Sequence, residues 1–276
     1  VENSAGFHRN GPEMYRRYLF LSLLLLASCA SKEIAVFVRP DPELEQKIAA
    51  TDDLCQKGSY VALKRAVETY TEAYALPGFR DTIAPKLAKA AILLAVREKE
   101  LGISNASNLD TALQVIKENR SLFHLTPFAE MAGLFWVQGK GVMADIDERF
   151  PYKVTEDKLK KIEADLSLQA KNDEFAAYMY AVMKCYGSLV PGVSLFDKKD
   201  ELDELAELFP GSKLLLYKRA TCPQEKPDHL KALLAAEPEF FEAHYFLAAE
   251  ALRRGKLLEA EESLQIQGAG NGHPLR

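Results

Sequence analysis

Apolar residues recur three and four positions apart through almost all of residues 43–267. One such run contains Leu63, Val67, Tyr70 and Tyr74. This spacing places the apolar side chains along one face of an α-helix. No segment of useful length alternates apolar and polar residues as a half-buried strand does. The sequence therefore predicts an all-α fold.

Proline and glycine interrupt this pattern at intervals. Proline removes a backbone N–H and glycine relaxes the backbone, so both tend to end helices. Helices separated by such short breaks usually pack as antiparallel pairs. The breaks fall at Leu76-Pro77-Gly78, Leu101-Gly102, Phe150-Pro151, Val190-Pro191-Gly192, Phe209-Pro210-Gly211 and Cys222-Pro223.

The clearest unit, residues 238–264, resembles a tetratricopeptide repeat, a helix–turn–helix unit of about 34 residues. With Gly255 in the turn, Ala248 and Ala260 take the positions at which the two helices approach closely. Earlier units match less well. We expect residues 43–267 to form a solenoid of degenerate tetratricopeptide-like helix pairs, in which stacked neighbours bury each unit's apolar face.

The N-terminal part has the order of a secretory signal. Two arginines precede an apolar run at residues 19–26, which is too short for a stable membrane-spanning helix. Residues 26–29, Leu-Ala-Ser-Cys, resemble the bacterial lipobox. The resemblance implies cleavage before Cys29 and lipidation of its thiol. The alternative is an ordinary secretory signal that contains a cysteine.

This interpretation divides the chain into four parts. We expect a leader and signal peptide at 1–28, a tether from the lipidated cysteine at 29–42, the helical-repeat domain at 43–267 and a flexible tail at 268–276. The protein would then be lipid-anchored in the cell envelope and face the periplasm. Ala30 stands where aspartate signals inner-membrane retention in many bacteria, so the outer membrane is favoured.

The charge argues against one class of partner. The chain has 35 basic and 40 acidic residues, a formal net charge of −5, and the two signs are interspersed. Nucleic-acid-binding proteins carry a basic patch or stripe, and none is present. Nucleic acid is therefore not an expected partner.

Besides Cys29, the chain contains Cys55, Cys185 and Cys222, and no two lie in a C-x-x-C motif. An oxidising envelope would permit a disulfide between Cys185 and Cys222. Sequence does not give the distance between them. Three separately buried thiols are the expected state.

No motif for catalysis or metal binding stands out. His124, His229 and His244 do not have the spacing of zinc ligands. The acidic run at residues 145–148 lacks the glycine and distal glutamate of a calcium loop. Phosphate loops and nucleophile elbows are also missing. We therefore expect a protein that is not an enzyme and that needs neither a metal nor another cofactor.

Two segments concentrate large, adaptable side chains. Methionine and aromatic residues suit adaptable apolar binding sites, although core packing also explains such clusters. We interpret them as a candidate cleft for an apolar ligand. Its candidate residues are Phe128, Met131, Phe135, Trp136, Tyr178, Met179 and Met183.

The chain also resembles the T component of TRAP transporters, a lipoprotein built of cryptic tetratricopeptide repeats. The resemblance rests on the lipobox, on Gly-Leu-Phe-Trp at 133–136, and on the segments 186–192, 197–209 and 214–220. It implies a periplasmic substrate-binding protein as the partner and a hydrophobic small molecule as the cargo.

Two other classes stay open. A scaffold lipoprotein of outer-membrane protein assembly also uses repeats that end in Phe-Pro-x-Ser, which residues 209–212 match. An envelope hydrolase acting on the cell wall would need a catalytic constellation, and we find none in the sequence.

The last repeat raises the question of what covers it. Solenoids normally end in a polar capping helix, and none follows Leu264. We expect the apolar face of this unit to contact a partner or a second copy of the chain. The alternative is that the second helix covers its own neighbour and the tail folds back over it. Leu252, Leu257 and Leu264 are the candidate interface residues.

Overall fold

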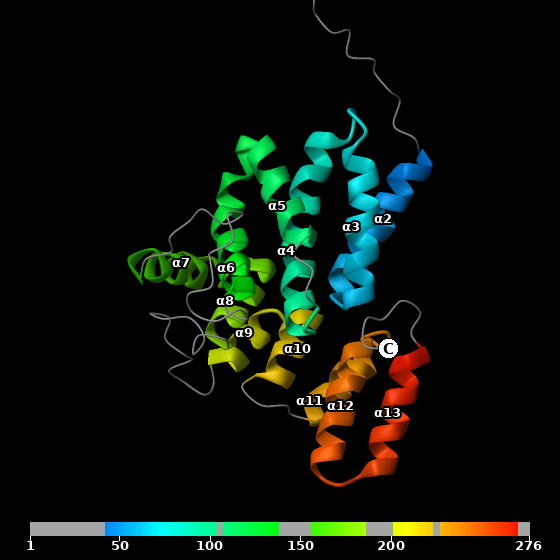
Figure 1. Ribbon diagram of the computed structural model, residues 1–276. Coiled ribbons are helices and arrows are strands. Elements are labelled where there is room, and N and C mark those ends of the chain that lie inside the picture. Colours follow the sequence, from blue (N-terminus) through cyan, green and yellow to red (C-terminus); the bar gives the residue numbers. More distant parts are fainter. Residues whose placement is uncertain (1–41, 104–106, 138–155, 186–200, 223–226, 270–276) are drawn as a thin grey trace, which may run out of the picture. The chain divides into compact units, whose positions relative to one another are not determined.

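The computed structural model describes residues 42–103, 107–137, 156–185, 201–222 and 227–269 (Figure 1). Within these ranges the protein is entirely helical, without a strand. The predicted all-α class is therefore confirmed. The signal peptide, Cys29 and the tether up to residue 41 lie outside the described residues, as does the acidic run at 145–148.

The helices occur in the following order. They are α2 (Pro42–Lys57), α3 (Tyr60–Tyr74), α4 (Arg80–Glu100), α5 (Ser107–Glu118), the 3-10 helix η1 (Arg120–Leu125), α6 (Thr126–Val137), α7 (Glu156–Gln169), α8 (Glu174–Cys185), α9 (Glu201–Leu208), α10 (Lys213–Thr221), α11 (Pro227–Ala236), α12 (Phe241–Arg253) and α13 (Leu257–Ala269).

The predicted breaks separate helices wherever the structure describes them. Helix α3 ends before Pro77, α9 ends before Pro210 and α10 ends before Pro223. The breaks at 150–151 and 190–192 lie outside the described residues. At the C-terminal end, α13 includes two residues that we assigned to the tail, 268 and 269.

The turn between α2 and α3 needs glycine for two reasons. Gly58 has a φ of +68°, in the left-handed region that other residues avoid. In addition, a Cβ atom at this position would lie 2.6 Å from Cγ of Leu214 in α10. The next residue, Ser59, caps α3 by accepting a hydrogen bond from the Ala62 N–H at 3.3 Å. The turn therefore allows α10 to pack closely against the start of α3.

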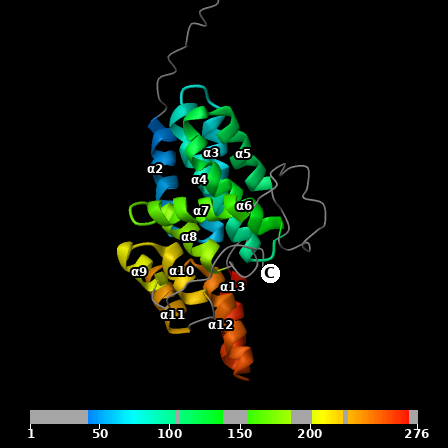
Figure 2. The same ribbon diagram turned by 90° about the vertical axis from the view of Figure 1, so that its left-hand side faces the viewer.

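Helix α4 lies at the centre of the main apolar core. It packs against α3, α5 and α6, and both views show it among these helices (Figures 1 and 2). Every residue from Ala90 to Glu98 is buried. Its apolar part, Ala90 to Val96, is apolar on all sides, as expected of a buried helix segment, whereas Arg97 and Glu98 bring charge into the interior. The core around it also includes residues of α2, α5, α6, α7, α8, α9 and α10.

Two smaller clusters follow in the C-terminal part. The first joins α10, α11 and α12 through Tyr217, Leu230, Leu233 and Phe240. The second consists of Ala248, Ala251 and Ala260 between α12 and α13. The C-terminal helices thus have apolar contacts of their own, separate from the main core.

Many helices pack against their neighbours in the chain, as a stack of helix pairs would require. Examples are α2 with α3, α3 with α4, α10 with α11 and α12 with α13. The contacts of α4 with α6 and of α8 with α10 join helices two apart in the order, as adjacent units of a solenoid would. The contact of α2 with α10 joins helices that are distant in the chain, and a simple solenoid would not make it.

The α12–α13 hairpin matches the helix pair expected from the sequence. Gly255 lies in its turn with a φ of +72°. Ala248 and Ala260 are both buried, at 1% exposure each. Small side chains let the two helix backbones approach closely.

Within the described part of the chain, no helix is both long enough and apolar enough to cross a bilayer.

Ala260→Trp should destabilise this hairpin, because a large side chain does not fit at a close helix contact. We expect a loss of about 1–3 kcal/mol in the free energy of unfolding, measured by urea denaturation. Glu262→Trp, at an exposed position of the same helix, is the matched control and should change stability little. Equal effects of the two substitutions would contradict the observed packing.

Candidate functional site

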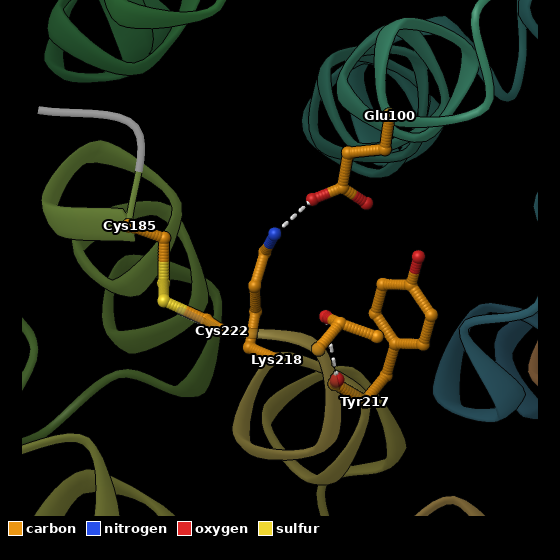
Figure 3. Close-up of a disulfide and its surroundings, with 6 residues drawn as sticks. Glu100, Cys185, Tyr217, Lys218 and Cys222 are labelled. Atoms are coloured by element: carbon orange, nitrogen blue, oxygen red, sulfur yellow. Dashed lines mark hydrogen bonds and ion pairs between the residues drawn. A yellow bond between two sulfur atoms is a disulfide. The ribbon is translucent and has the colours of Figure 1, made fainter. Parts of the chain in front are cut away.

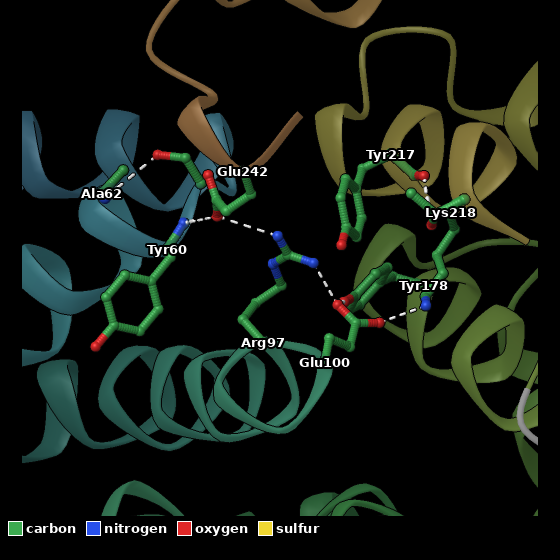
Figure 4. Close-up of polar contacts among 10 residues, drawn as sticks. Tyr60, Ala62, Arg97, Glu100, Tyr178, Tyr217, Lys218 and Glu242 are labelled. Carbon is green, nitrogen blue, oxygen red and sulfur yellow. Dashed lines mark hydrogen bonds and ion pairs between the residues drawn. The ribbon is translucent and has the colours of Figure 1, made fainter. Parts of the chain in front are cut away.

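A group of buried charges lies where α3, α4, α10 and α12 meet. At its centre is Arg97 of α4, whose side chain is fully buried. Its Nη2 atom donates to Oε1 of Glu242 in α12 at 3.0 Å, and its Nη1 atom donates to Oε2 of Glu100 (Figure 4). Arg97 thus joins two carboxylates that are 142 positions apart in the sequence.

Lys218 of α10 and the start of α3 complete this group. The Lys218 ammonium forms an ion pair with Oε1 of Glu100, and both side chains are 1% exposed. Oε1 of Glu242 also accepts a hydrogen bond from the Tyr60 backbone N–H in the first turn of α3. We call Arg97, Glu100, Lys218 and Glu242 the buried charge network. It has two positive and two negative groups, so each buried charge has an opposite partner.

Aromatic rings surround the network. The Arg97 guanidinium lies over the Tyr217 ring, 3.8 Å from its centroid, and 5.5 Å from the centroid of Phe240. Such contacts between a cation and an aromatic face are favourable, and more so when water is excluded. The Tyr178 hydroxyl of α8 donates to Oε2 of Glu100 at 3.3 Å. Apolar ring surface and polar contacts thus enclose the same charges.

The ionised state of the network follows from its pairing. Burial by itself would raise the pKa of Glu100, but the charges of Lys218 and Arg97 outweigh it and hold the pKa below its usual range. Burial would likewise lower the pKa of Arg97, yet its negative neighbours raise it well above the usual value. The carboxylate and the guanidinium therefore both stay charged at neutral pH.

The buried charge network is positioned to hold helices together, because its side chains are closed off from solvent. A substrate or ligand has no access to Arg97 or Glu242, whose side chains are fully buried. The network therefore has a structural role: it fixes the first turns of α3 and α12 against the end of α4. Sequence reasoning missed it. The available signal was charge inside apolar runs, as at Arg97 after Leu93-Leu94-Ala95-Val96.

A disulfide joins Cys185 at the end of α8 to Cys222 after α10, with a Cα–Cα distance of 5.9 Å (Figure 3). The expectation of three separate thiols is therefore wrong. The two cysteines meet because α8 and α10 pack side by side, which sequence spacing alone does not reveal. Cys55 remains a free thiol, and burial raises its pKa to about 11.

A pocket of about 320 Å³ opens near α4, η1, α6, α7 and α8. Of the residues predicted to form an apolar cleft, Phe128 lines this pocket. Met131, Tyr178, Met179 and Met183 are instead buried in the main core, where they pack between helices. Phe135 and Trp136 lie in helix α6, but their side chains are outside the described part of the structure.

The pocket is lined by both apolar and polar side chains. Its lining residues are Lys89, His124, Leu125, Phe128, Leu168, Gln169, Asn172, Asp173 and Phe175.

The predicted interface leucines are on the surface of the α12–α13 hairpin. Leu252 and Leu264 are exposed, and Leu257 is 69% exposed. The structure adds Leu258, which is 82% exposed and was not predicted. Whether these residues contact a partner stays a prediction.

Among the described residues, no group of three or more His, Cys, Asp or Glu side chains is placed to hold a metal ion. Burial lowers the pKa of His244, so this histidine is largely neutral at neutral pH.

Comparisons with known proteins place the chain in no group. No protein-family model matches it, and neither the curated proteins nor the solved structures gave a match.

Replacing Glu242 tests whether the buried charge network holds the protein together. Glu242→Gln keeps the side-chain size but leaves an excess positive charge in the interior. We expect the free energy of unfolding to fall by about 3–5 kcal/mol, the usual cost of removing one partner of a buried ion pair.

Glu239→Gln is the matched control for this test. Glu239 pairs with Lys57 at 2.9 Å, but its side chain is 63% exposed. Such surface pairs contribute at most about 1 kcal/mol. Chemical denaturation of both variants measures the difference, and similar small losses in the two would contradict a structural role for Glu242.

Proposed function

We propose that this chain is an exported lipoprotein that acts as a protein-binding helical scaffold. Its specific role would be that of the T component of a TRAP-type transport system, which works with a periplasmic substrate-binding protein on a hydrophobic ligand. One observation carries the proposal that the chain binds another protein: the α12–α13 hairpin exposes Leu252, Leu257, Leu258 and Leu264, which we call the leucine face.

Two features support export. The first is the lipobox-like sequence at residues 26–29. The second is the disulfide between Cys185 and Cys222, because disulfides persist in oxidising compartments and are rare in the cytosol. Together they favour a lipid-anchored protein of the cell envelope, with the outer membrane as the favoured membrane.

The leucine face supports binding to another protein. Leu252, Leu257, Leu258 and Leu264 are exposed on two consecutive helices. Clusters of exposed apolar side chains framed by polar residues often mark interaction sites. The exposed acidic residues Glu259, Glu261 and Glu262 share α13 with three of these leucines. A suitable partner would present an apolar patch bordered by basic side chains.

The helix pairs support the repeat interpretation. The α12–α13 hairpin has glycine in its turn and alanines at the helix contact, as a tetratricopeptide repeat requires. The contact of α10 with α2 goes beyond a simple stack. We therefore propose a compact form of a degenerate repeat scaffold, braced by contacts between distant helices.

A scaffold of outer-membrane protein assembly is the second candidate. The Phe-Pro-x-Ser match at residues 209–212 has a definite structural role, since Ser212 caps α10 by accepting a hydrogen bond from the Leu215 N–H at 3.3 Å. This cap favours residues 209–212 as the boundary between two helical units.

The lipid anchor is tested with Cys29→Ala. This variant lacks the acceptor thiol, so we expect an unprocessed precursor that carries no lipid. Metabolic labelling with a fatty acid in the native host measures the modification. Cys55→Ala serves as the control and should be labelled like the unmodified protein. Labelled Cys29→Ala protein would overturn the lipobox interpretation.

The partner is tested by affinity purification of the full chain from envelope extracts. A periplasmic substrate-binding protein should copurify if the transport assignment is right, and a β-barrel assembly factor if the second candidate is right. Leu257→Asp/Leu258→Asp should reduce recovery of the partner about tenfold or more, because it places charges in an apolar interface.

Leu208→Asp is the matched control for the pull-down, since Leu208 is also exposed but lies on α9. It should leave partner recovery unchanged. If the double variant and the control recover the same amount of partner, the leucine face is not the docking surface.

A further inference from the structure

The pocket beside α8 has an apolar base made of aromatic rings. Phe128 of α6 and Phe175 of α8 contact each other with their ring centroids 4.8 Å apart. Leu125 of η1 is buried next to them, whereas Leu168 of α7 lies exposed at the rim. The pocket volume of about 320 Å³ is at the lower end of the range of small-molecule sites, roughly 300–1,000 Å³. A small ligand with an apolar group fits these dimensions.

Two opposite charges stand side by side in the same pocket. Nζ of Lys89 lies 3.5 Å from Oδ2 of Asp173, and both side chains are more than a third exposed. One turn earlier on α4, Lys86 forms a much shorter pair with Asp52, at 2.6 Å. The Lys89–Asp173 pair is thus loose by comparison and remains open to other charged groups.

The surrounding contacts hold both charges in place. Oδ1 of Asp173 accepts the Ala176 N–H at 2.7 Å, which fixes the carboxylate at the start of α8. Nζ of Lys89 lies 5.2 Å from the centroid of the Phe175 ring. A cation and an anion are therefore presented directly beside the aromatic base.

This arrangement determines which ligands the pocket favours. A ligand with one charge is attracted by one member of the pair and repelled by the other, so most of the Coulomb energy cancels. A ligand with adjacent positive and negative groups is attracted by both. The carboxamides of Gln169 and Asn172 line the pocket and offer both donors and acceptors to such a ligand.

We propose that this pocket binds a small zwitterion with an apolar side chain, that is, a hydrophobic α-amino acid. The ligand carboxylate pairs with Lys89, its ammonium group pairs with Asp173, and its side chain packs on Phe128 and Phe175. This site is separate from the buried charge network and from the leucine face. The inference goes beyond the proposed function and does not depend on it.

The test is calorimetric titration of the purified full chain with L-phenylalanine. Three analogues each lack one feature of the ligand: 3-phenylpropionate lacks the ammonium group, 2-phenylethylamine lacks the carboxylate, and glycine lacks the apolar side chain. We expect L-phenylalanine to bind and each analogue to bind at least about tenfold more weakly. The first two analogues lose a hydrogen bond to a charged group, and glycine loses the burial of an apolar ring; each loss is of about this size or larger.

Substitutions in the protein test the same pairing from the other side. Lys89→Met and Asp173→Asn should each weaken binding of L-phenylalanine about tenfold or more. Asparagine caps helices as well as aspartate does, so Asp173→Asn removes the charge while keeping the start of α8 intact. Lys86→Met, which removes a lysine on the same helix that does not line the pocket, is the matched control and should bind normally.

Three results would overturn the proposal. The first is absence of heat with L-phenylalanine up to millimolar concentration in a chain that melts cooperatively. The second is equal binding of 3-phenylpropionate, which would make this a site for amphiphilic anions. The third is equal weakening by Lys86→Met and Lys89→Met, which would place the effect outside the pocket.

Discussion

The contact of Arg97 with Glu242 is the interaction on which the arrangement of the helices depends. Helix α4 lies at the centre of the main core, and its last turns carry Arg97. Nη2 of Arg97 lies 3.0 Å from Oε1 of Glu242 in the first turn of α12. Because both side chains are fully buried, neither charge has water as an alternative partner. An arrangement that separates α12 from α4 removes Glu242 from the buried charge network and leaves an excess positive charge in the interior, at a cost of several kcal/mol. Apolar contacts are far less selective for one orientation.

The distribution of apolar clusters explains why such a contact is needed. The clusters around Phe240 and Ala260 serve α10 to α13 and are separate from the main core. Apolar packing thus stabilises each part without fixing α12 on α3 and α4. Glu242 does so, since it accepts from the Tyr60 N–H and from Arg97 together. Exposed ion pairs such as that of Lys57 with Glu239 add little to the attachment of α12 to α3 and α4.

Sequence predicted the local features of the fold, because periodicity, turns and caps act between residues close in the chain. The helix breaks before Pro77 and Pro210 and the close contact at Ala248 and Ala260 follow from such rules. The buried charge network and the disulfide both join residues that are far apart in the chain. Their separation along the sequence does not indicate their distance in space. The pocket was predicted only at Phe128, because most of the predicted cleft residues face the core.

Helix α10 connects these long-range interactions. Lys218 reaches Glu100, Tyr217 stacks on Arg97, and Cys222 closes the disulfide to α8, all within six consecutive residues. The same helix packs against Gly58 through Leu214. A cross-link at the end of α10 therefore limits how far Lys218 and Tyr217 can move from the charges they enclose. The covalent bond and the buried charges thus constrain the same helix, and through it the position of the hairpin that carries the leucine face.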